Sequence, residues 1–354
     1  MCKYFNFHEK DVLIQDRKQD NKMYCSERNE EKKDWTPFLS FPVTQNCNFH
    51  CLYCGQGGEA TATTKGNILL TQIKEIVEIS IRNGVKKFRL TGGEPLLHND
   101  IDNILNFFSE LGYFTLVNTN GSMILKKQDI LDKIHTNIKF AVSLDTLDKD
   151  KLFKISHVSC HEDIINGIKY LKRLGLLFRV NMVVGRYNFD EVDDIIKFCQ
   201  KIGCDLKLLD IVSVPIPYNS RSENYAEISS LEKRLAMTCD EIYSHEYSRG
   251  FGTPCYRYKF GDTFVTIKNS VKGSHYDVEN GGLCVNCKYF PCHEGLYDIF
   301  ALSDGRLCSC RWTEKQEYSD KSLQLKFLIN LFRRSIYIPK ENNDDMGIRT
   351  DLIK

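Results

Sequence analysis

Three cysteines near the start of the chain have the residue type and the spacing that could hold an iron–sulfur cluster. Cys47, Cys51 and Cys54 follow one another in a C-x3-C-x2-C pattern. Cysteine thiolates hold such clusters, and a [4Fe–4S] cluster usually takes four of them. Three thiolates in so short a loop would bind three irons and leave the fourth open to a substrate or cofactor. The spacing therefore indicates chemistry rather than electron storage, although three unrelated buried thiols are the alternative.

A glycine-rich motif follows at the end of a predicted strand at 85–91. It consists of Gly92, Gly93, Glu94 and Pro95. Paired glycines let a ligand approach the backbone closely, the glutamate adds an acceptor, and proline fixes the turn. Parallel α/β scaffolds bind ligands at the carboxyl ends of their strands. An ordinary glycine-rich turn is the alternative, but the position one strand–helix unit after the cysteine loop favours a ligand site.

Small polar side chains mark two further strand ends. Asn120 follows a predicted strand at 113–118, and Ser143 and Asp145 end the predicted strand at 138–144. Each lies where a ligand would bind on a parallel sheet. Capping of a turn or helix is an equally good interpretation of either group alone.

The cysteine spacing, with Tyr53 just before the last cysteine, resembles the signature of the radical S-adenosylmethionine (SAM) superfamily, and the Gly-Gly-Glu run resembles a second motif of that family. The resemblance implies that SAM chelates the open iron and that the Gly92–Pro95 region receives the methionine ammonium. It also implies that Asn120, Ser143 and Asp145 line the SAM ribose and methionine sites. The expected activity is reductive cleavage of SAM to a 5′-deoxyadenosyl radical, which abstracts hydrogen from a substrate.

The elements that must position these residues alternate between strands and helices. The predicted strands are 38–44, 85–91, 113–118, 138–144, 177–184 and 205–212, and the predicted helices are 70–83, 101–111, 126–134, 161–174, 190–202, 230–244 and 322–332. Such alternation implies parallel βαβ units. Six strands are too few for a full eight-stranded barrel. We predict an α/β fold, a partial (β/α)6 TIM-type barrel at 35–245, with a polar extension at 1–34 and a smaller C-terminal iron–sulfur domain at 246–354.

The runs at 88–97, 142–148 and 180–186 narrow the resemblance to the GTP cyclase of molybdenum-cofactor biosynthesis. This implies a small-molecule, nucleotide-like substrate that is cyclised or rearranged. Three departures argue against GTP itself. Ser40 stands where the cyclase has an arginine, no arginine follows Cys287 in the next eight residues, and the C-terminal Gly-Gly tail of the cyclase is absent. A triphosphate needs several cationic donors.

A second group of cysteines suggests another metal site. Cys284 and Cys287 form a C-x2-C pair, and Cys292, Cys308 and Cys310 follow. The spacing suits zinc or an iron–sulfur cluster. The superfamily resemblance favours an auxiliary [4Fe–4S] cluster on Cys284, Cys287 and Cys310, with Cys292 as the fourth ligand and Cys308 as the alternative. Full ligation resembles the SPASM/twitch domains of peptide-modifying radical SAM enzymes, so a ribosomally made peptide is the alternative substrate.

Composition limits the partners. The 354 residues carry a net charge of +1 and 15 cysteines. This charge gives no electrostatic case for a nucleic-acid or membrane partner, and neither a membrane span nor a signal peptide is expected. The cysteines indicate a reducing, cytoplasmic location. We expect an electron donor such as flavodoxin or ferredoxin. A non-catalytic iron–sulfur electron carrier is a third hypothesis, which the Gly-Gly-Glu motif argues against because a carrier needs no SAM site.

Overall fold

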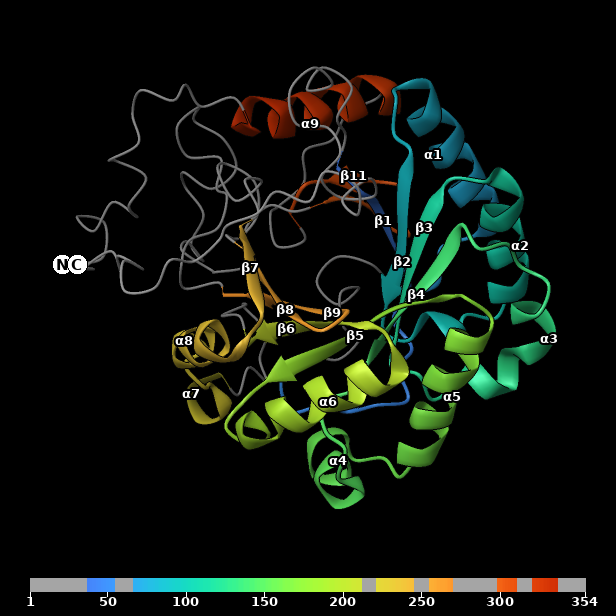
Figure 1. Ribbon diagram of the computed structural model, residues 1–354. Helices are drawn as coiled ribbons and strands as arrows, with labels where there is room; N and C mark the ends of the chain where they lie inside the picture. Colours follow the sequence, from blue (N-terminus) through green and yellow to red (C-terminus); the bar gives the residue numbers. More distant parts are fainter. Residues whose placement is uncertain are drawn as a thin grey trace.

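The computed structural model describes residues 37–54, 66–211, 221–244, 255–269, 298–310 and 320–336. Within these residues, parallel strands alternate with helices, and the helices lie on the outer side of a curved sheet (Figure 1). The strands are β1 (Leu39–Thr44), β2 (Lys87–Gly92), β3 (Phe114–Thr119), β4 (Ile138–Ser143), β5 (Leu177–Val184) and β6 (Asp205–Asp210). The order and parallel pairing of the six strands confirm the predicted partial-barrel architecture.

The outer helices are α1 (Leu70–Arg82), α2 (Ile101–Leu111), α3 (Gln128–Leu131), α4 (Lys149–Ser156), α5 (His161–Arg173) and α6 (Val192–Ile202). Short 3-10 turns join some of them: η2 (Pro95–Leu97), η3 (Ile124–Lys127) and η4 (Phe189–Glu191). The predicted helix at 126–134 is therefore one 3-10 turn and one short α-helix. The sequence analysis placed no helix at α4, which becomes important for the cysteine loop.

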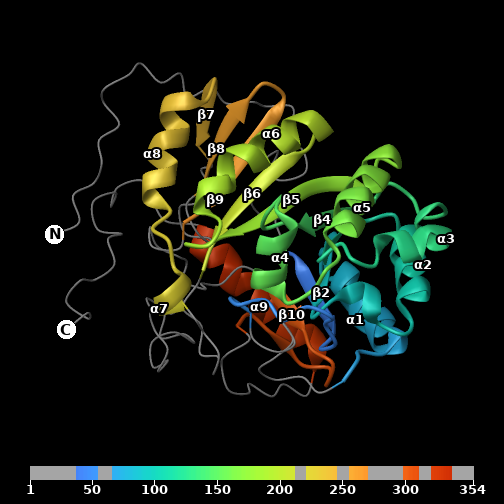
Figure 2. The same ribbon diagram turned by 90° about the horizontal axis from the view of Figure 1, so that it is seen from below.

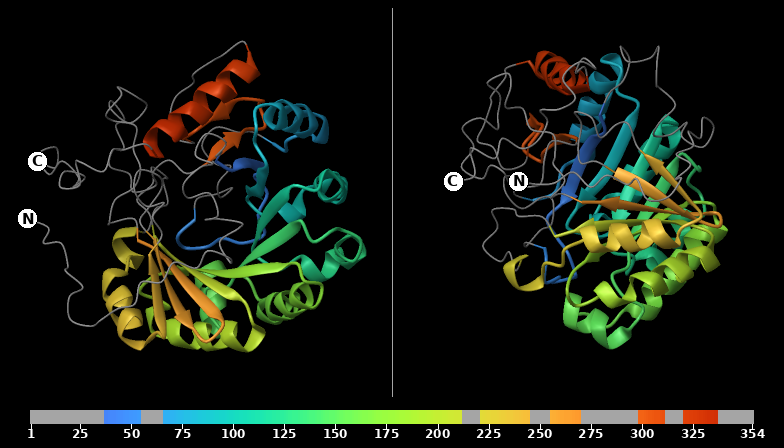
Figure 3. Two further views of the ribbon diagram at one scale, coloured as in Figure 1. Left: turned by 45° about the horizontal axis from the view of Figure 1, so that its top comes forward. Right: turned by 60° about the vertical axis from the view of Figure 1, so that its left-hand side comes forward.

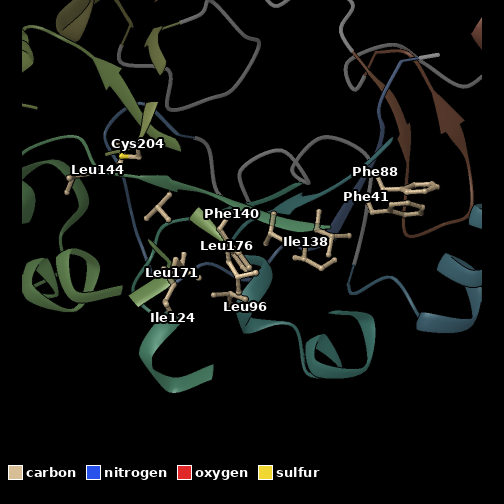
Figure 4. Packing of buried hydrophobic residues seen from close by; sticks show 14 of the residues in the cluster. Phe41, Phe88, Leu96, Ile124, Ile138, Phe140, Leu144, Leu171, Leu176 and Cys204 are labelled. Carbon is tan, nitrogen blue, oxygen red and sulfur yellow. The ribbon is translucent and has the colours of Figure 1, made fainter. Parts of the chain in front are cut away.

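The hydrophobic core lies between the strands and the outer helices. Val180, Met182 and Val184 of β5 are buried in it, while the alternate residues of that strand are only half-buried. Side chains alternate between the two faces of a strand, so these alternate residues face the opposite side. Phe41 of β1 and Phe88 of β2 lie close together in the core (Figure 4). The strand face away from the helices is called the inner face below.

The sheet continues beyond both edges of the six-strand unit (Figure 3). Next to β6 come β9 (Thr263–Lys268), β8 (Cys255–Phe260) and β7 (Glu241–Ser244), and next to β1 come β10 (Ile299–Ala301) and β11 (Leu307–Cys308). Strands β8 to β11 follow residue 245 in sequence, yet they belong to the same sheet as the barrel strands. The separate iron–sulfur domain at 246–354 stays a prediction.

Three further helices flank these edges. They are α7 (Arg221–Asn224), α8 (Ser229–Thr238) and α9 (Lys321–Ile336). In Figure 2, α8 lies beside the edge formed by β7 to β9, and α9 lies on the side of β10. Lys321 of α9 pairs with Glu75 of α1 at 2.9 Å, which fixes α9 against the first helix of the barrel.

The predicted helix at 230–244 is wrong in its last part. Cys239 has an extended backbone, and the residues after it form β7, which pairs with β8. Ile242 is buried in the core, and the amide of Asp240 donates to the carbonyl oxygen of Lys259 at 2.9 Å. These contacts with a distant strand outweigh the helical spacing of the local sequence.

None of the described helices is long and apolar enough to span a bilayer.

Candidate active site

The three predicted cluster cysteines lie in one loop directly after β1. Cys47 and Cys51 are half-buried and Cys54 is exposed. Burial raises the pKa of the Cys51 thiol well above its usual value, and the nearby Asp145, Cys54 and Cys47 raise it further. Among the described residues, no three His, Cys, Asp or Glu side chains converge closely enough to hold one metal ion. A cubane needs no such convergence, because each thiolate binds a different iron.

The end of helix α4 holds the middle of the cysteine loop. The amide of His50 donates to the carbonyl oxygen of Ser156 at 3.0 Å, and the amide of Leu52 donates to that of Ile155 at 2.9 Å. These carbonyls belong to the last turn of α4, where helical partners are lacking. His157 ends the helix in the left-handed conformation, with a φ of 59°. The loop therefore supplies partners that the helix end needs.

A closed ring of side-chain hydrogen bonds holds the start of the loop to the end of β3. The Asn120 amide donates to the Asn48 side-chain oxygen at 2.9 Å, and the Asn48 amide donates to Ser122 Oγ at 2.9 Å. Ser122 Oγ donates to Asn120 Oδ1 at 2.7 Å. Asn120 Nδ2 also lies 4.0 Å from Cys47 Sγ. Asn120 is thus placed beside the first cysteine.

Gly92 and Gly93 let the base of the cysteine loop approach the end of β2. A Cβ on Gly92 would collide with the backbone of Thr44, and one on Gly93 with the backbone of Asn46. Gly92 also has a φ of +137°, which side-chain-bearing residues rarely adopt. The amide of Gly93 donates to the carbonyl oxygen of Thr44 at 2.8 Å. The glycines therefore allow a close approach of two protein segments, a task that the sequence analysis did not foresee.

Glu94 is fully buried, and its carboxylate accepts three hydrogen bonds from the protein. Leu96 N donates to Oε1 at 3.0 Å, Thr119 Oγ1 donates to Oε1 at 2.7 Å, and Asn120 N donates to Oε2 at 2.6 Å. Burial raises the pKa of Glu94 to about 7 against the effect of these donors. Pro95 then starts η2, a position that suits proline. The carboxylate ties the end of β2 to the end of β3.

Asp145 connects the cysteine loop to the ends of β4 and β5. Tyr53 donates its hydroxyl to Asp145 Oδ2 at 2.5 Å, and Val183 N donates to Oδ1 at 2.8 Å. Burial raises the pKa of Asp145 to about 6. The side chain of Asn188 donates to the Asp145 carbonyl oxygen at 2.7 Å. Tyr53, the aromatic residue just before Cys54, is thereby fixed by a carboxylate that follows the end of β4.

Ser143 lies on the inner face, in a row of polar residues that crosses several strands. It pairs with Asn181, which pairs with Lys207, then Thr266 and Arg257. The neighbouring row contains Arg179, opposite Asp205, and Lys268 lies opposite Leu209. Arg179, Lys207, Lys268 and Arg257 are basic and Asp205 is acidic, so these residues carry a net charge of +3. The inner face is basic on the side of β5, β6, β8 and β9.

On the opposite edge, a compact ionic group joins β10 to β1 and β2. Arg89 pairs with Asp298 at 2.6 Å, and Ser40 Oγ donates to the same carboxylate oxygen at 2.5 Å. Arg89 Nε donates to Ser40 Oγ at 3.0 Å. Asp298 is buried and balances the charge of Arg89. Ser40, which stands where the cyclase resemblance would place an arginine, is thus hydrogen-bonded to an acidic residue.

The structure describes only some of the cysteines predicted to hold the second cluster. Cys284, Cys287 and Cys292 lie outside the described residues. Cys308 and Cys310 are half-buried at the end of β11, while Ser309 between them is buried. This alternation is that of an extended chain, in which residues two apart lie on the same face. Their role as ligands stays a prediction.

The sequence analysis missed Tyr187, which lies just past the end of β5. Burial raises the pKa of its hydroxyl, and Asp145 and Cys51 raise it further. The next residue, Asn188, donates to the carbonyl oxygen of Asp145, whose carboxylate accepts from Tyr53 of the cysteine loop. The hydroxyl is buried and has no hydrogen-bond partner. Gly185, two residues earlier, is the signal that could have pointed to it: a Cβ there would lie 2.5 Å from the Tyr187 ring.

Comparison with known proteins agrees with this geometry. Residues 41–199, which include the cysteine loop and strands β2 to β5, match the family model described as the radical SAM superfamily. They form a radical SAM domain. Two curated relatives of this radical SAM enzyme are a probable GTP 3′,8-cyclase of Methanocella arvoryzae, 27% identical over 76% of this chain and 86% of that protein, and the GTP 3′,8-cyclase of Helicobacter pylori, 24% identical over 86% and 91%.

Solved radical SAM structures share the fold at low sequence identity. Streptococcus suis SuiB bound to S-adenosylmethionine superposes with a TM-score of 0.61 and 19% identity, over 88% of this chain and 70% of that one. Native anSMEcpe with bound AdoMet gives 0.52 and 13% identity, over 84% and 82%. These likenesses concern the fold alone.

The radical SAM family uses a [4Fe–4S] cluster and SAM, and the residues of this site fit both. The donor set is three thiols, the ligands that iron–sulfur clusters take. The unpartnered Tyr187 hydroxyl beside them is a buried polar group that a bound molecule would satisfy. The fixed positions of Asn120 and Asp145 place polar groups on both sides of the cysteine loop.

Proposed function

We propose that the protein is a radical SAM enzyme acting on an anionic, nucleotide-like small molecule that lies over the basic inner face. In this proposal Cys47, Cys51 and Cys54 hold the catalytic cluster. Gly92, Gly93, Glu94, Pro95, Asn120, Ser143 and Asp145 form the surroundings of SAM. When bound, the cluster supplies the electron that splits SAM into methionine and a 5′-deoxyadenosyl radical, and the protein orients and insulates the reactants.

The observation that carries the substrate class is the row of basic residues on the inner face. Lys207 and Arg257 share one row with Ser143 and Asn181, and Arg179 lies in the next row along β5. Lysine and arginine side chains are the groups that bind phosphates and carboxylates. Asn181 accepts a hydrogen bond from Arg179 Nε at 2.8 Å, which orients that guanidinium. An anion over β5 and β6 would meet several of these cations.

The ionic group at the other edge favours an anion smaller than a triphosphate. Asp298 balances Arg89, and Ser40 offers a hydroxyl in place of a charge. The cations are therefore concentrated on the side of β5, β6, β8 and β9. A nucleoside monophosphate or a comparable singly or doubly charged molecule matches this one-sided distribution better than GTP does. The similarity to GTP 3′,8-cyclases supports the nucleotide-like character of the substrate.

A peptide is the second candidate. One structural neighbour is SuiB bound to its precursor peptide SuiA. This likeness concerns the fold, and the basic inner face would suit an acidic peptide segment. The proposed auxiliary [4Fe–4S] cluster on Cys284, Cys287, Cys292 and Cys310 is compatible with either substrate. An electron donor of the flavodoxin or ferredoxin type and a cytoplasmic location stay predictions.

Binding measurements on a matched set of ligands separate these candidates. Guanosine, GMP and GTP differ in the number of their phosphate groups, so equilibrium dialysis with the anaerobically reconstituted enzyme reports how many phosphates the site prefers. We expect GMP to bind more tightly than guanosine, and Lys207→Met to weaken GMP at least tenfold. Lys169→Met, at an exposed position on α5, is the control and should leave binding unchanged.

The opposite pattern would favour the peptide. Equal affinity for guanosine and GMP, or a loss of GMP binding in Lys169→Met as large as in Lys207→Met, would contradict a nucleotide subsite on the inner face. Tight binding of GTP with weak binding of GMP would instead favour GTP as the substrate.

A further inference from the structure

Tyr187 presents a buried hydroxyl for which the described part of the chain provides no hydrogen-bond partner. Its oxygen is shielded from solvent and has no hydrogen-bond partner. Buried polar groups in folded proteins are almost always paired, so an exception calls for a specific explanation. Two other tyrosines of the described residues have a partner: Tyr53 donates to Asp145 and Tyr170 donates to Asp132, both at 2.5 Å.

The surrounding loop holds the ring in this position. Gly185 lacks the Cβ that would lie 2.5 Å from Cε1 and 2.6 Å from Cζ of the Tyr187 ring. Asn188 is fully buried, and its side chain accepts from Gly185 N at 2.8 Å and donates to the Val183 carbonyl oxygen at 2.9 Å. Arg186 N donates to the Asn224 carbonyl oxygen at 2.9 Å. The orientation of the hydroxyl is therefore built into the turn and is not a surface rotamer.

The carboxylate of Asp145 already accepts hydrogen bonds from two other groups. Asp145 lies close enough to raise the pKa of Tyr187 after the larger effect of burial. Its Oδ2 accepts from Tyr53 and its Oδ1 from Val183 N. Cys51, the other group that raises this pKa, belongs to the proposed cluster. Among the described residues neither group bonds to the Tyr187 hydroxyl, which leaves it available to an acceptor on a bound molecule.

We infer that the Tyr187 hydroxyl donates a hydrogen bond to SAM bound at the cluster, as a cofactor-binding residue that no motif of the sequence identifies. This inference rests on the proposed function. Tyr187 lies beyond the carboxyl end of β5, in the turn whose Asn188 donates to the Asp145 carbonyl oxygen, and the Asp145 carboxylate accepts from Tyr53 of the cysteine loop. The basic residues proposed for the substrate lie earlier along β5 and on β6. The molecule that reaches both the cysteine loop and Tyr187 is therefore the one that binds the cluster.

Tyr187→Phe and Tyr170→Phe form a matched pair of variants for the test. Each is reconstituted anaerobically, and SAM affinity, iron content and the melting temperature without SAM are measured. We expect Tyr187→Phe to weaken SAM about tenfold, which corresponds to about 1.4 kcal/mol. Its iron content should match the wild type, and its melting temperature should be equal or higher, because an unpaired buried hydroxyl is removed. Tyr170→Phe should lose thermal stability and keep its SAM affinity.

Gly185→Ala provides a second, independent variant. It keeps the hydroxyl but displaces the ring, so it should weaken SAM as Tyr187→Phe does. Wild-type SAM affinity in Tyr187→Phe would overturn the inference and leave the proposed function intact. A parallel fall in iron content and SAM binding would also overturn it, since the ring would then be a structural support of the loop. If wild-type enzyme with a full cluster binds no SAM, the proposed function and this inference both fail.

Discussion

Glu94 has a buried carboxylate that carries out an internal task at the edge of the proposed SAM site. Its two oxygens receive donors from η2, β3 and the residue after β3, so no oxygen is left without a protein partner. The side chain therefore acts as a clamp between two strand ends. Contact between SAM and this region would involve the backbone more readily than the carboxylate.

The raised pKa of Glu94 gives the clamp a pH signature. The folded-state pKa is about 7, above the usual 4.5, so the folded protein holds a proton that the unfolded chain releases between these values. Stability from this group is complete below pH 4.5 and is lost as the pH rises through 7. In Glu94→Gln this dependence disappears. The difference in unfolding free energy between wild type and Glu94→Gln should shrink by roughly 3 kcal/mol between pH 5 and pH 8.

Thermal melting of both proteins across this pH range makes the comparison. Asp145→Asn serves as the control. The carboxyl group of Asp145 has a pKa of about 6, so its removal should change the pH dependence of stability about one pH unit lower than the removal of Glu94 does. A difference between wild type and Glu94→Gln that stays constant from pH 5 to pH 8 would contradict the raised pKa.

The sequence predicted which residues of the site come together but not what they bond to. Cys47, Cys51, Cys54, Glu94, Asn120 and Asp145 do lie around one loop. The donors to Glu94 are backbone amides and a threonine hydroxyl, which no spacing rule identifies. Tyr187 was missed because its importance depends on a lack of partners, and only three-dimensional coordinates can show that.

At the scale of elements, helix α4 supports the cysteine loop. Asp148 caps its first turn by accepting from Asp150 N at 2.7 Å and Lys151 N at 3.0 Å. The other end of the helix supplies the carbonyls that hold His50 and Leu52. Helix α4, which follows β4, therefore holds the loop that carries the proposed cluster ligands.

His157 is the position where this support can be tested. Among the described residues, it is the non-glycine residue with positive φ, a conformation that costs about 1 kcal/mol for a residue with a side chain. His157→Gly should raise the melting temperature and keep the iron content. His157→Val should lower the melting temperature and reduce the iron bound per chain, because a β-branched residue shifts the last turn of α4.

Lys154→Val is the matched control for this pair. It places the same β-branched side chain at an exposed position of the same helix, where φ is ordinary. If Lys154→Val loses as much iron as His157→Val, then helix propensity, and not the left-handed end of α4, explains the effect.

Elements were predictable where the local pattern and the tertiary contacts agree. The bounds predicted for β5 are those observed, because alternating apolar residues there face a core that the helices complete. The residues of β7 instead have a helical pattern, and their strand conformation comes from pairing with β8. Helix α4 was missed because eight residues with few apolar positions give a weak periodic signal.

At the scale of the whole molecule, a segment from near the end of the sequence completes the edge of the sheet at the start of the barrel. Strand β10 pairs in parallel with β1, and Asp298 binds both Ser40 and Arg89. The sequence analysis gave no indication of this pairing. A long-range pairing of this kind leaves no trace in local periodicity, and the ion pair joins residues too far apart for any motif.

A double-mutant cycle on Arg89 and Asp298 tests how much this closure stabilises the fold. Asp298→Ala leaves a largely buried arginine without its counter-charge, so it should destabilise the protein by about 3 kcal/mol. Arg89→Met with Asp298→Ala should be less destabilised than the sum of the single variants, with a coupling energy of about 2 kcal/mol. Additive losses in urea denaturation would show that the two side chains stabilise the sheet independently.

The central claim is that SAM is cleaved at a cluster held by Cys47, Cys51 and Cys54. The most direct measurement is the amount of 5′-deoxyadenosine that anaerobically reconstituted protein forms from SAM and dithionite. The wild type should form it and should carry more than one [4Fe–4S] cluster. The variant with alanine at all three positions should lose one cluster and form none. Undiminished 5′-deoxyadenosine in that variant, or none from wild-type protein with a full complement of iron and sulfide, would contradict the account.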